Sequence, residues 1–510
     1  MSNGPPLQTR YFYKLLANLV GLFINVGIQA IVPRGLGPEA YGSFHFLTNF
    51  FSQVTGFLDL GTSTGFYVKL SQRQKDHGLI TFYLLFMVLA MTILFALVVA
   101  SSWADLTPIL WPEQELRYIY MAALWSALTW ISNICTKVGD AYGLTVSIEK
   151  IRIMQKVLGL IVVAGLFFSD ILSLETFFFY HYFTLIFLTV GQIWVMLLAG
   201  RLLWPLVRPT FANMFAYGKE LYHYSHPLVV FMLVGAVTMI LDRWLLQRFS
   251  GSLEQGFYSL AYQIGAICIL FTSAMTPLIQ REFAIAFENK NMQEMSRLFR
   301  RYIPLLYFVA AFLACFIVIH AQRVTFFLGG DTYADAILAT TIMVLFPIHQ
   351  TYGQLNGSVF YATGQTGMYR NIGVVFMLIG LPITYFLIAP TEQHGLELGA
   401  AGLAVKMVGL QFIAVNVQLY YNVKTLKLSF LHFFGHQIVS LLVLLLIAFG
   451  SEAAASTLIT ANDLNGMILG FLLSGIIYTA GVLLLVYRLP KIVGLKQEDV
   501  QRILRYLHPG

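Results

Sequence analysis

Long apolar runs, free or nearly free of charge, recur along the whole chain and constrain its fold more than any other feature. About 20 such residues suffice for a helix to cross the hydrocarbon core of a bilayer. Only 11% of the 510 residues are charged, whereas a soluble domain has about 25%. We therefore predict an all-α polytopic membrane protein. Its fourteen predicted transmembrane helices cover 13–33, 41–68, 79–103, 117–138, 150–169, 175–199, 222–247, 256–281, 302–322, 335–362, 371–390, 399–422, 435–455 and 465–487.

The distribution of lysine and arginine predicts the orientation of these helices. With an even number of spans, both termini lie on the same side of the membrane. If that side is the cytoplasm, 25 of the 31 basic residues fall on the cytoplasmic side. The outer exceptions are Arg34, Arg117, Arg243, Arg248, Arg323 and Lys406. Basic residues concentrate on the cytoplasmic side of membrane proteins, so both termini are expected to be cytoplasmic.

Several classes of function find no support in the residues. The net charge of +7 follows from the basic inner face and does not require a nucleic-acid partner. The three cysteines, Cys135, Cys268 and Cys315, are too scattered for a metal site or a disulfide framework. No phosphate-binding loop, zinc-protease motif or serine-hydrolase motif occurs. We therefore expect neither an enzyme nor a resident cofactor.

Two pairs of similar motifs indicate an internal repeat. The segment 34–46, RGLGPEAYGSFHF, resembles 248–262, RFSGSLEQGFYSLAY, and 139–145 resembles 361–370. Six spans separate the members of each pair, which is typical of a duplicated transporter with its substrate site between the halves. We predict an N-terminal lobe over 1–220, a C-terminal lobe over 221–430, two trailing helices over 431–487, and a cytoplasmic amphipathic tail over 488–510.

Polar side chains gather in a few of the predicted spans. They predict a hydrated cavity, because lipid cannot satisfy so many hydrogen-bonding groups. The alternative is that they tie neighbouring helices together. The trailing helices are expected to be nearly devoid of such residues. The candidates for the cavity are Asn25, Gln29, Asn49, Gln350 and Asn356.

Charged residues inside or at the ends of spans are further candidates. Asp59 follows a long apolar run, where a carboxylate facing lipid costs about 2.5 to 3.5 kcal/mol, so we expect it to face the interior. It is the candidate for coupling transport to H⁺ or Na⁺. Lys69, Lys137 and Arg281 lie at predicted cytoplasmic helix ends, and Lys406 lies within a span. They could form a cationic mouth for an anionic head group, or simply extend toward the membrane surface.

The motif RGLGPEAYGSF with the later Asp59-Leu60-Gly61 resembles the polysaccharide, or O-antigen (Wzx-like), flippases of the multidrug/oligosaccharidyl-lipid/polysaccharide exporter (MOP) superfamily. So do Asp242-Arg243-Trp244, 256–262 and the Gly-Gly-Asp-Thr-Tyr turn at 329–333. The resemblance implies two six-helix lobes, MATE-like, plus two C-terminal helices. It also implies a cationic cavity and a bacterial or archaeal cytoplasmic (inner) membrane.

The implied activity is translocation of undecaprenyl-pyrophosphate-linked oligosaccharide to the outer leaflet by alternating access, for surface polysaccharide biosynthesis. The implied partners are the bilayer, this lipid-linked substrate, and a polysaccharide polymerase with its chain-length machinery. The first two spans lack the internal arginines of the related peptidoglycan-precursor flippases. Phosphate contacts are therefore expected from Lys69, Lys137, Arg281 or Lys406.

Two alternatives remain open. A multidrug antiporter of the same superfamily would use acidic cavity residues for organic cations, whereas the polar helix ends here are mainly basic. A membrane glycosyltransferase or polymerase acting on the same lipid carrier would need carboxylates or arginines on a sizeable outer loop, and the predicted outer loops are short.

Overall fold

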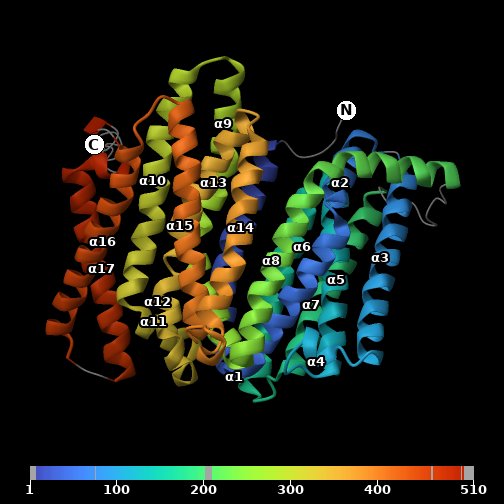
Figure 1. The fold of residues 1–510 in the computed structure, drawn as a ribbon, viewed down its shortest axis with the longest axis horizontal. Helices are drawn as coiled ribbons and strands as arrows, with labels where there is room; N and C mark the ends of the chain where they lie inside the picture. Colours follow the sequence, from blue (N-terminus) through green and yellow to red (C-terminus); the bar gives the residue numbers. More distant parts are fainter. Residues whose placement is uncertain (1–6, 75, 201–209, 461–462, 496, 499–510) are drawn as a thin grey trace. The chain divides into compact units, whose positions relative to one another are not determined.

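The computed structural model describes residues 7–74, 76–200, 210–460, 463–495 and 497–498, and this part of the chain is helical apart from turns and connections (Figure 1). Within it, ten helical segments are long and apolar enough to cross a membrane. The chain is therefore a multi-pass membrane protein, and the count of fourteen spans stays a prediction. Most of the predicted amphipathic tail, 499–510, lies outside the described residues.

The chain divides into two compact units, Met1–Gly256 and Phe257–Gly510. This division falls within the long helix α8, so the predicted lobe boundary near residue 220 remains a prediction. The helices of the first unit, with α8 continuing past its end, are α1 (Leu7–Asp59), α2 (Thr62–Gln72), α3 (His77–Trp103), α4 (Thr107–Leu110), α5 (Leu116–Ala141), α6 (Thr145–Phe168), α7 (Leu174–Leu198) and α8 (Phe211–Ala266).

Helix α1 bends at Gly37, within the segment where two glycines and a proline predict the end of a span. Gly37 has φ 73° and ψ 168°, and Pro33 and Pro38 also lie inside the helix. A positive φ combined with an extended ψ is essentially restricted to glycine. The interruption is therefore a single residue, after which the helix resumes.

Helix α8 bends in the same way at Gly251, with φ 76° and ψ −176°. Gly37 and Gly251 occupy corresponding motifs of the predicted repeat. The second pair of motifs behaves alike: Gly143, between α5 and α6, has φ 78°, and Gly364, between α13 and α14, has φ 71°. Both pairs of motifs that predict the repeat thus contain a glycine with positive φ, which supports the duplication.

The bends of α1 and α8 lie against each other without intervening side chains. A Cβ atom at Gly42 would lie 1.9 Å from the carbonyl oxygen of Ser252, and one at Gly256 would lie 2.0 Å from that of Pro38. The Ser43 hydroxyl donates a hydrogen bond of 3.1 Å to the Ser252 hydroxyl. Glycine at these positions therefore permits a backbone-to-backbone approach.

The connection between α4 and α5 holds the α8 bend. A Glu113 carboxylate oxygen accepts hydrogen bonds from the Ser252 amide at 3.1 Å and from the Gln247 side chain at 3.3 Å. The Gln114 side chain donates to the Ser252 hydroxyl at 3.0 Å. These bonds satisfy groups that the interrupted helix leaves unpaired.

Apolar side chains from several helices of the first unit form one core cluster. Phe66 on α2, Tyr83 on α3 and Trp130 on α5 are buried in it, with Leu221 from the start of α8. The rings of Phe66 and Tyr83 stack with their centroids 4.4 Å apart. Leu58, which precedes the break between α1 and α2, packs against this cluster.

The second unit is built around α13, which is buried along most of its length. α13 contacts α9, α10 and α15, and its Tyr352 ring meets the Tyr307 ring of α10 edge to face at 5.0 Å. Its helices beyond α8 are α9 (Leu270–Glu288), α10 (Met292–Ile319), α11 (Ala321–Gly329), α12 (Ile337–Met343), α13 (Phe346–Ala362), α14 (Thr366–Ile388), α15 (Gly399–Thr425), α16 (Phe430–Leu458) and α17 (Leu464–Arg488).

The expectation that the two trailing helices are nearly devoid of polar residues is wrong. α16 buries Gln437 and Ser451, and α17 buries Ser474. Small residues let helices approach closely in membranes, and their hydroxyls can then hydrogen-bond across the contact. Here the Ser451 and Ser474 hydroxyls lie 3.3 Å apart.

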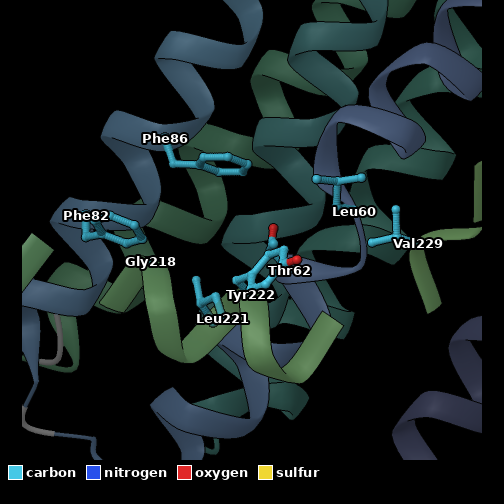
Figure 2. Close-up of a pocket in the computed structure, with 8 residues that line it drawn as sticks. All are labelled: Leu60, Thr62, Phe82, Phe86, Gly218, Leu221, Tyr222 and Val229. Carbon is cyan, nitrogen blue, oxygen red and sulfur yellow. The ribbon is translucent and has the colours of Figure 1, made fainter. Parts of the chain in front are cut away.

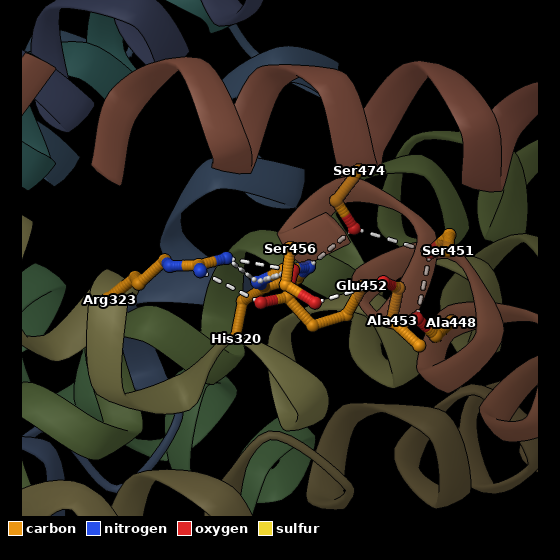
Figure 3. A network of polar contacts seen from close by, with 8 residues as sticks. All are labelled: His320, Arg323, Ala448, Ser451, Glu452, Ala453, Ser456 and Ser474. Carbon is orange, nitrogen blue, oxygen red and sulfur yellow. Dashed lines mark hydrogen bonds and ion pairs between the residues drawn. The ribbon is translucent and has the colours of Figure 1, made fainter. Parts of the chain in front are cut away.

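A polar network then ties this pair to the connection between α10 and α11 (Figure 3). The buried His320 imidazole lies 2.9 Å from the Ser474 hydroxyl. Arg323 lies 3.1 Å from the other nitrogen of that ring and 2.8 Å from the Glu452 carboxylate of α16. The trailing helices are thus anchored by hydrogen bonds and an ion pair in addition to apolar contact.

Candidate functional site

Asp59 is the last residue of α1, where the helix breaks. Leu60 has φ 48° and Gly61 has φ 73°, and α2 begins at Thr62. The predicted span 41–68 is therefore not one helix, and that expectation is corrected. A left-handed glycine ends a helix readily because it carries no Cβ. Asp59 consequently lies at a junction between two helices, where its carboxylate can reach groups from both sides of the break.

The Asp59 carboxylate accepts hydrogen bonds from four donors. They are the Ser63 amide at 3.0 Å, the Ser63 hydroxyl at 2.7 Å, the Tyr83 hydroxyl at 2.6 Å and the Thr62 hydroxyl at 3.2 Å. The amide belongs to the first turn of α2 and would otherwise have no helical partner. Asp59 therefore joins α1 and α2 to α3 and faces protein, as the sequence predicted.

Lys137 of α5 completes this cluster. Its ammonium donates a 2.6 Å hydrogen bond to the Ser63 hydroxyl, which in turn donates to Asp59. The structure thus brings together two of the residues that the sequence singled out, Asp59 and Lys137, through one serine.

A second group of charges joins the end of α2 to the start of α8. The Lys69 ammonium lies 2.9 Å from a Glu220 oxygen, and Arg73 contacts both oxygens of that carboxylate, at 2.6 and 3.2 Å. Burial alone would raise the pKa of Glu220, but the hydrogen bonds from Lys69 and Arg73 lower it below its ordinary value. Glu220 therefore carries its negative charge at neutral pH.

A hydrogen bond between a phenol and a carboxylate accompanies this ion pair. The Tyr217 hydroxyl donates to the Asp76 carboxylate at 2.6 Å. Burial, together with this bond to a carboxylate, raises the pKa of Tyr217 to about 12. We call Lys69, Arg73, Asp76, Tyr217 and Glu220 the α2–α8 latch.

An apolar pocket of about 160 Å³ is lined by residues that neighbour both groups of charges in the sequence (Figure 2). Leu60 follows Asp59, and Leu221 follows Glu220. The pocket is bounded by α3, the beginning of α8 and the turn between α1 and α2. The side chains that line it include Leu60, Thr62, Phe82, Phe86, Leu221 and Tyr222. Two of these side chains, Thr62 and Tyr222, carry hydroxyl groups, and the Thr62 hydroxyl donates to the backbone oxygen of Asp59 at 2.6 Å.

The remaining candidates of the first unit lie along α1. Asn25 is exposed, and Gln29 accepts a hydrogen bond of 3.0 Å from the Tyr41 hydroxyl. Asn49 is half-buried, and its buried side-chain oxygen accepts no hydrogen bond from the described residues. Gln29 thus connects the two parts of α1 on either side of its bend. Asn49 has a buried acceptor that is still available inside the unit.

In the second unit, two candidate amides connect helices. The buried Asn356 donates to the Val415 carbonyl of α15 at 3.2 Å and accepts from Asn422 at 3.1 Å. Gln350 accepts from Gln411 at 2.6 Å. These contacts follow the alternative that the sequence left open, in which polar groups tie helices together.

The two basic candidates of the second unit lie in contrasting surroundings. Arg281 is 70% exposed and pairs with its neighbour Glu282 at 2.8 Å. Lys406 is buried, and its side chain passes over Gly380 of α14, where a Cβ atom would meet it at 2.9 Å. Only Lys406 is therefore placed inside the unit.

The sequence did not single out Ser63, Tyr83 or Glu220. Ser63 stands four residues after Asp59, one turn along the helix that resumes there, so its proximity follows once the break is known. Tyr83 and Glu220 come from distant parts of the chain, and only the packing of α3 and α8 brings them near. No local pattern identifies such partners.

The fold is similar to that of several solved transporters. Neither a family model nor a curated protein matches the sequence. The lipid II flippase MurJ, in an inward closed conformation, matches with a TM-score of 0.67 at 12% identity, over 94% of this chain and 99% of that chain. An inward-facing multidrug-resistance MATE transporter of the MOP superfamily matches with a TM-score of 0.56 at 15% identity, over 84% of this chain and 97% of that one.

A further match is a MOP superfamily transporter from Pyrococcus furiosus described as having a binding pocket of reverse polarity. Its TM-score is 0.53 at 16% identity, over 82% of this chain and 96% of that one. Since the identities are low, these likenesses concern the fold. The chain described here therefore has the fold of the MOP superfamily transporters.

Proposed function

We propose that this protein is a flippase that moves an undecaprenyl-pyrophosphate-linked oligosaccharide from the cytoplasmic to the outer leaflet, with both termini in the cytoplasm. The substrate's glycan and phosphates are too polar to cross lipid unaided, whereas its polyprenyl tail can remain in the membrane. A transporter for it needs a protein path that receives negative charge. It needs no hydrolytic site.

The observation that carries this proposal is the charge balance of the first unit. Asp59 is already engaged by Ser63 and Tyr83, and through Ser63 by Lys137. An organic cation would have to compete with these donors for the carboxylate. Lys69 and Arg73 add two further positive charges and share the single carboxylate of Glu220. Asp76, the third carboxylate, accepts a hydrogen bond from Tyr217. Each acidic group near these cations is thus already engaged, whereas Lys69 and Arg73 share one carboxylate, which favours an anionic substrate over a cationic drug.

The extent of the structural likeness also supports a flippase. The match to the lipid II flippase covers 94% of this chain, compared with 84% for the MATE transporter. A fold likeness is compatible with many substrates, so our preference for a flippase rests on the charges of the site. The solved structures described above are all transporters or flippases.

Alternating access would follow from the duplicated architecture, in which two repeats rock about a shared substrate site. The paired bends at Gly37 and Gly251 are natural positions for such motion, because glycine absorbs changes in φ and ψ at low cost. Asp59 is our candidate for coupling to H⁺ or Na⁺. Protonation or sodium binding there would weaken its bonds to Ser63 and Tyr83 and so alter the contact between α1, α2 and α3.

The function can be tested in a deletion strain by assigning lipid-linked repeat units to a leaflet. We expect them to accumulate in the inner leaflet without the protein and to reach the outer leaflet when it is restored. Unpolymerised units accumulating in the outer leaflet would instead identify an enzyme acting after translocation. Unchanged leaflet distribution with increased sensitivity to cationic drugs would identify a drug antiporter.

The coupling role of Asp59 needs a separate experiment. Transport by the wild type and by Asp59→Asn should be compared across a pH series, with and without Na⁺. We expect the variant to lose the dependence on the gradient while retaining slow equilibration. Wild-type rates at every pH would exclude Asp59 as the coupling residue.

A further inference from the structure

Two basic side chains share the Glu220 carboxylate where α2 and α8 come together, while Asp76, the other carboxylate of the latch, is bound by Tyr217. Lys69 and Arg73 both contact Glu220, at 2.9 and 2.6 Å. All three side chains keep part of their surface exposed: 25% for Lys69 and Glu220 and 47% for Arg73. Exposed ion pairs are weak, because water and salt screen them. A more highly charged anion could therefore displace the carboxylate.

The apolar pocket lies on the same two helices. Thr62 lines it at the start of α2, and Gly218 and Leu221 line it on either side of Glu220. Along α2, seven residues separate Thr62 from Lys69, which is about 10 Å at the rise of an α-helix. The pocket and the cation pair are thus close enough for one amphiphilic molecule to contact both.

The size of the pocket suits a small branched hydrocarbon. A cavity of about 150 Å³ lined by apolar side chains accommodates a molecule of the size of benzene, and this pocket measures about 160 Å³. A five-carbon isoprenoid unit fits that space. Phe82 and Phe86 provide flat apolar walls for its methyl branch.

We propose that the pocket and the latch together form an entry site for the polyprenyl-pyrophosphate part of the substrate, with an isoprenoid unit in the pocket and the pyrophosphate on Lys69 and Arg73 in place of Glu220. Glu220 then acts as an internal stand-in for the substrate's phosphate while the site is empty. This inference rests on the proposed flippase function and names the part of the substrate that is recognised first.

The charges favour a pyrophosphate over an ordinary phospholipid. The phosphodiester of a phospholipid carries one negative charge, so exchanging it for the Glu220 carboxylate leaves the local balance unchanged. A pyrophosphate carries more than one negative charge and can neutralise both cations at once. Its oxygens also match the planar donor fork of Arg73. Releasing Glu220 would simultaneously free the start of α8 from α2.

The inference can be tested by binding to the purified full-length protein in nanodiscs of neutral lipid. The probes are farnesyl pyrophosphate, inorganic pyrophosphate and farnesol, with phosphatidylglycerol as the competing phospholipid. We expect the wild type to bind farnesyl pyrophosphate more tightly than the other two probes. We expect phosphatidylglycerol to compete poorly. Equal competition by phosphatidylglycerol would overturn the assignment in favour of a general lipid site.

Two variants separate the roles of latch and pocket. Glu220→Gln removes the internal anion without shortening the side chain and should tighten farnesyl pyrophosphate binding about two- to fivefold, the range expected for an exposed ion pair. Phe86→Trp partly fills the pocket and should weaken farnesyl pyrophosphate while leaving inorganic pyrophosphate unchanged. Unchanged or weaker binding by Glu220→Gln, or no effect of Phe86→Trp, would overturn the proposal.

The matched control is Glu294→Gln. Glu294 pairs with Arg297 at the surface of α10, so the substitution removes a comparable ion pair far along the chain from the pocket. It should leave binding of every probe unchanged. A size-exclusion profile identical to that of the wild type confirms that each variant is folded.

The leaflet assay distinguishes failure of the entry site from failure of the function. If the wild type flips its substrate but Glu220→Gln and Phe86→Trp bind farnesyl pyrophosphate like the wild type, the entry site is wrong and the flippase stands. If the wild type moves no lipid-linked oligosaccharide, the proposed function is wrong, whatever the probes bind.

Discussion

The two units use buried polar groups differently. In the first unit, charged side chains meet at a helix break, where Asp59 and Lys137 are joined through Ser63. In the second, amides such as Asn356 connect α13 to α15 in the middle of helices. Charges at a junction can change partners when the junction moves, whereas amides inside a helix contact resist such motion. The comparison suggests that the first unit contains the switching elements and that α13 with α15 forms a fixed frame.

The largest expected effect concerns the close approach of the α1 and α8 bends in the first unit, where any switching motion would have to pass. Gly42→Ala places a methyl group where the Ser252 carbonyl lies 1.9 Å away. The backbones of α1 and α8 must then separate, and we expect a loss of about 3 kcal/mol in the free energy of unfolding. Thermal unfolding in detergent would measure it.

The matched control for this change is Gly56→Ala in the same helix. A Cβ atom at Gly56 would meet nothing within 4 Å, so the variant should unfold at or above the wild-type temperature. Equal unfolding temperatures for the two variants would show that the bends do not depend on their close approach.

Asn356→Ala tests the frame in the second unit. It removes the acceptor of Asn422 and the donor to Val415 inside a fully buried contact. We expect a loss of about 1 to 2 kcal/mol in unfolding free energy, because two buried hydrogen bonds are lost while Asn422 keeps only its bond to the backbone carbonyl of residue 356. The leaflet assay should give nearly wild-type rates per folded molecule. The exposed Asn371→Ala serves as a neutral reference.

A strong loss of transport by Asn356→Ala, with unfolding unchanged, would reverse the assignment of frame and switch. It would place Asn356 in the substrate path, as the sequence analysis predicts for the cavity candidates.

Lys137→Met tests the switch in the first unit. Asp59 retains its bonds to Ser63 and Tyr83, so we expect the unfolding free energy to change by less than about 1 kcal/mol. The transport rate should fall about tenfold, equivalent to about 1.4 kcal/mol in the barrier, because an internal positive charge is lost. Lys137→Arg should restore part of the rate. Equal rates for the methionine variant and the wild type would remove Lys137 from the mechanism.

The smallest effect is expected from pH acting on the latch. The pKa of Glu220 is lowered, so its ion pairs form above its ordinary pKa and are lost only as the pH falls through the lowered value. The pKa of Tyr217 is raised to about 12, so its bond to Asp76 is complete below about pH 10 and is lost as the pH rises further.

The latch should therefore not vary between about pH 5 and 9. Unfolding temperatures of the wild type and Glu220→Gln, measured across that range, should differ by a constant amount. A difference that changes near pH 7 would mean that another titrating group acts through the latch.

The sequence predicts those features that depend on local chemistry. Hydrophobic runs reveal the helices, and the glycine-rich motifs locate the repeated bends at Gly37 and Gly251. Asp59 was correctly expected to face protein. The break immediately after it was missed, because the three-residue signal Asp59-Leu60-Gly61 lies inside an otherwise apolar run and one glycine alone does not end a helix.

Partners from distant segments could not be predicted. Glu220 meets Lys69 and Arg73 only because α8 returns beside α2, and nothing in 211–223 distinguishes that carboxylate from a surface residue. Polar residues of α13 were expected in a wet cavity, yet Asn356 bonds to α15. The sequence shows how many polar groups a helix carries. Whether water or a neighbouring helix satisfies their hydrogen bonds depends on how the helices pack.

The contact between the Ser43 and Ser252 hydroxyls, 3.1 Å apart at the facing bends of α1 and α8, offers a means of control. Cysteines at these two positions would bring their sulfur atoms within range of a disulfide. An oxidant would then clamp the bends together, and a reductant would release them. Transport by this double variant would become a redox-gated process that can be stopped and restarted within one preparation of vesicles.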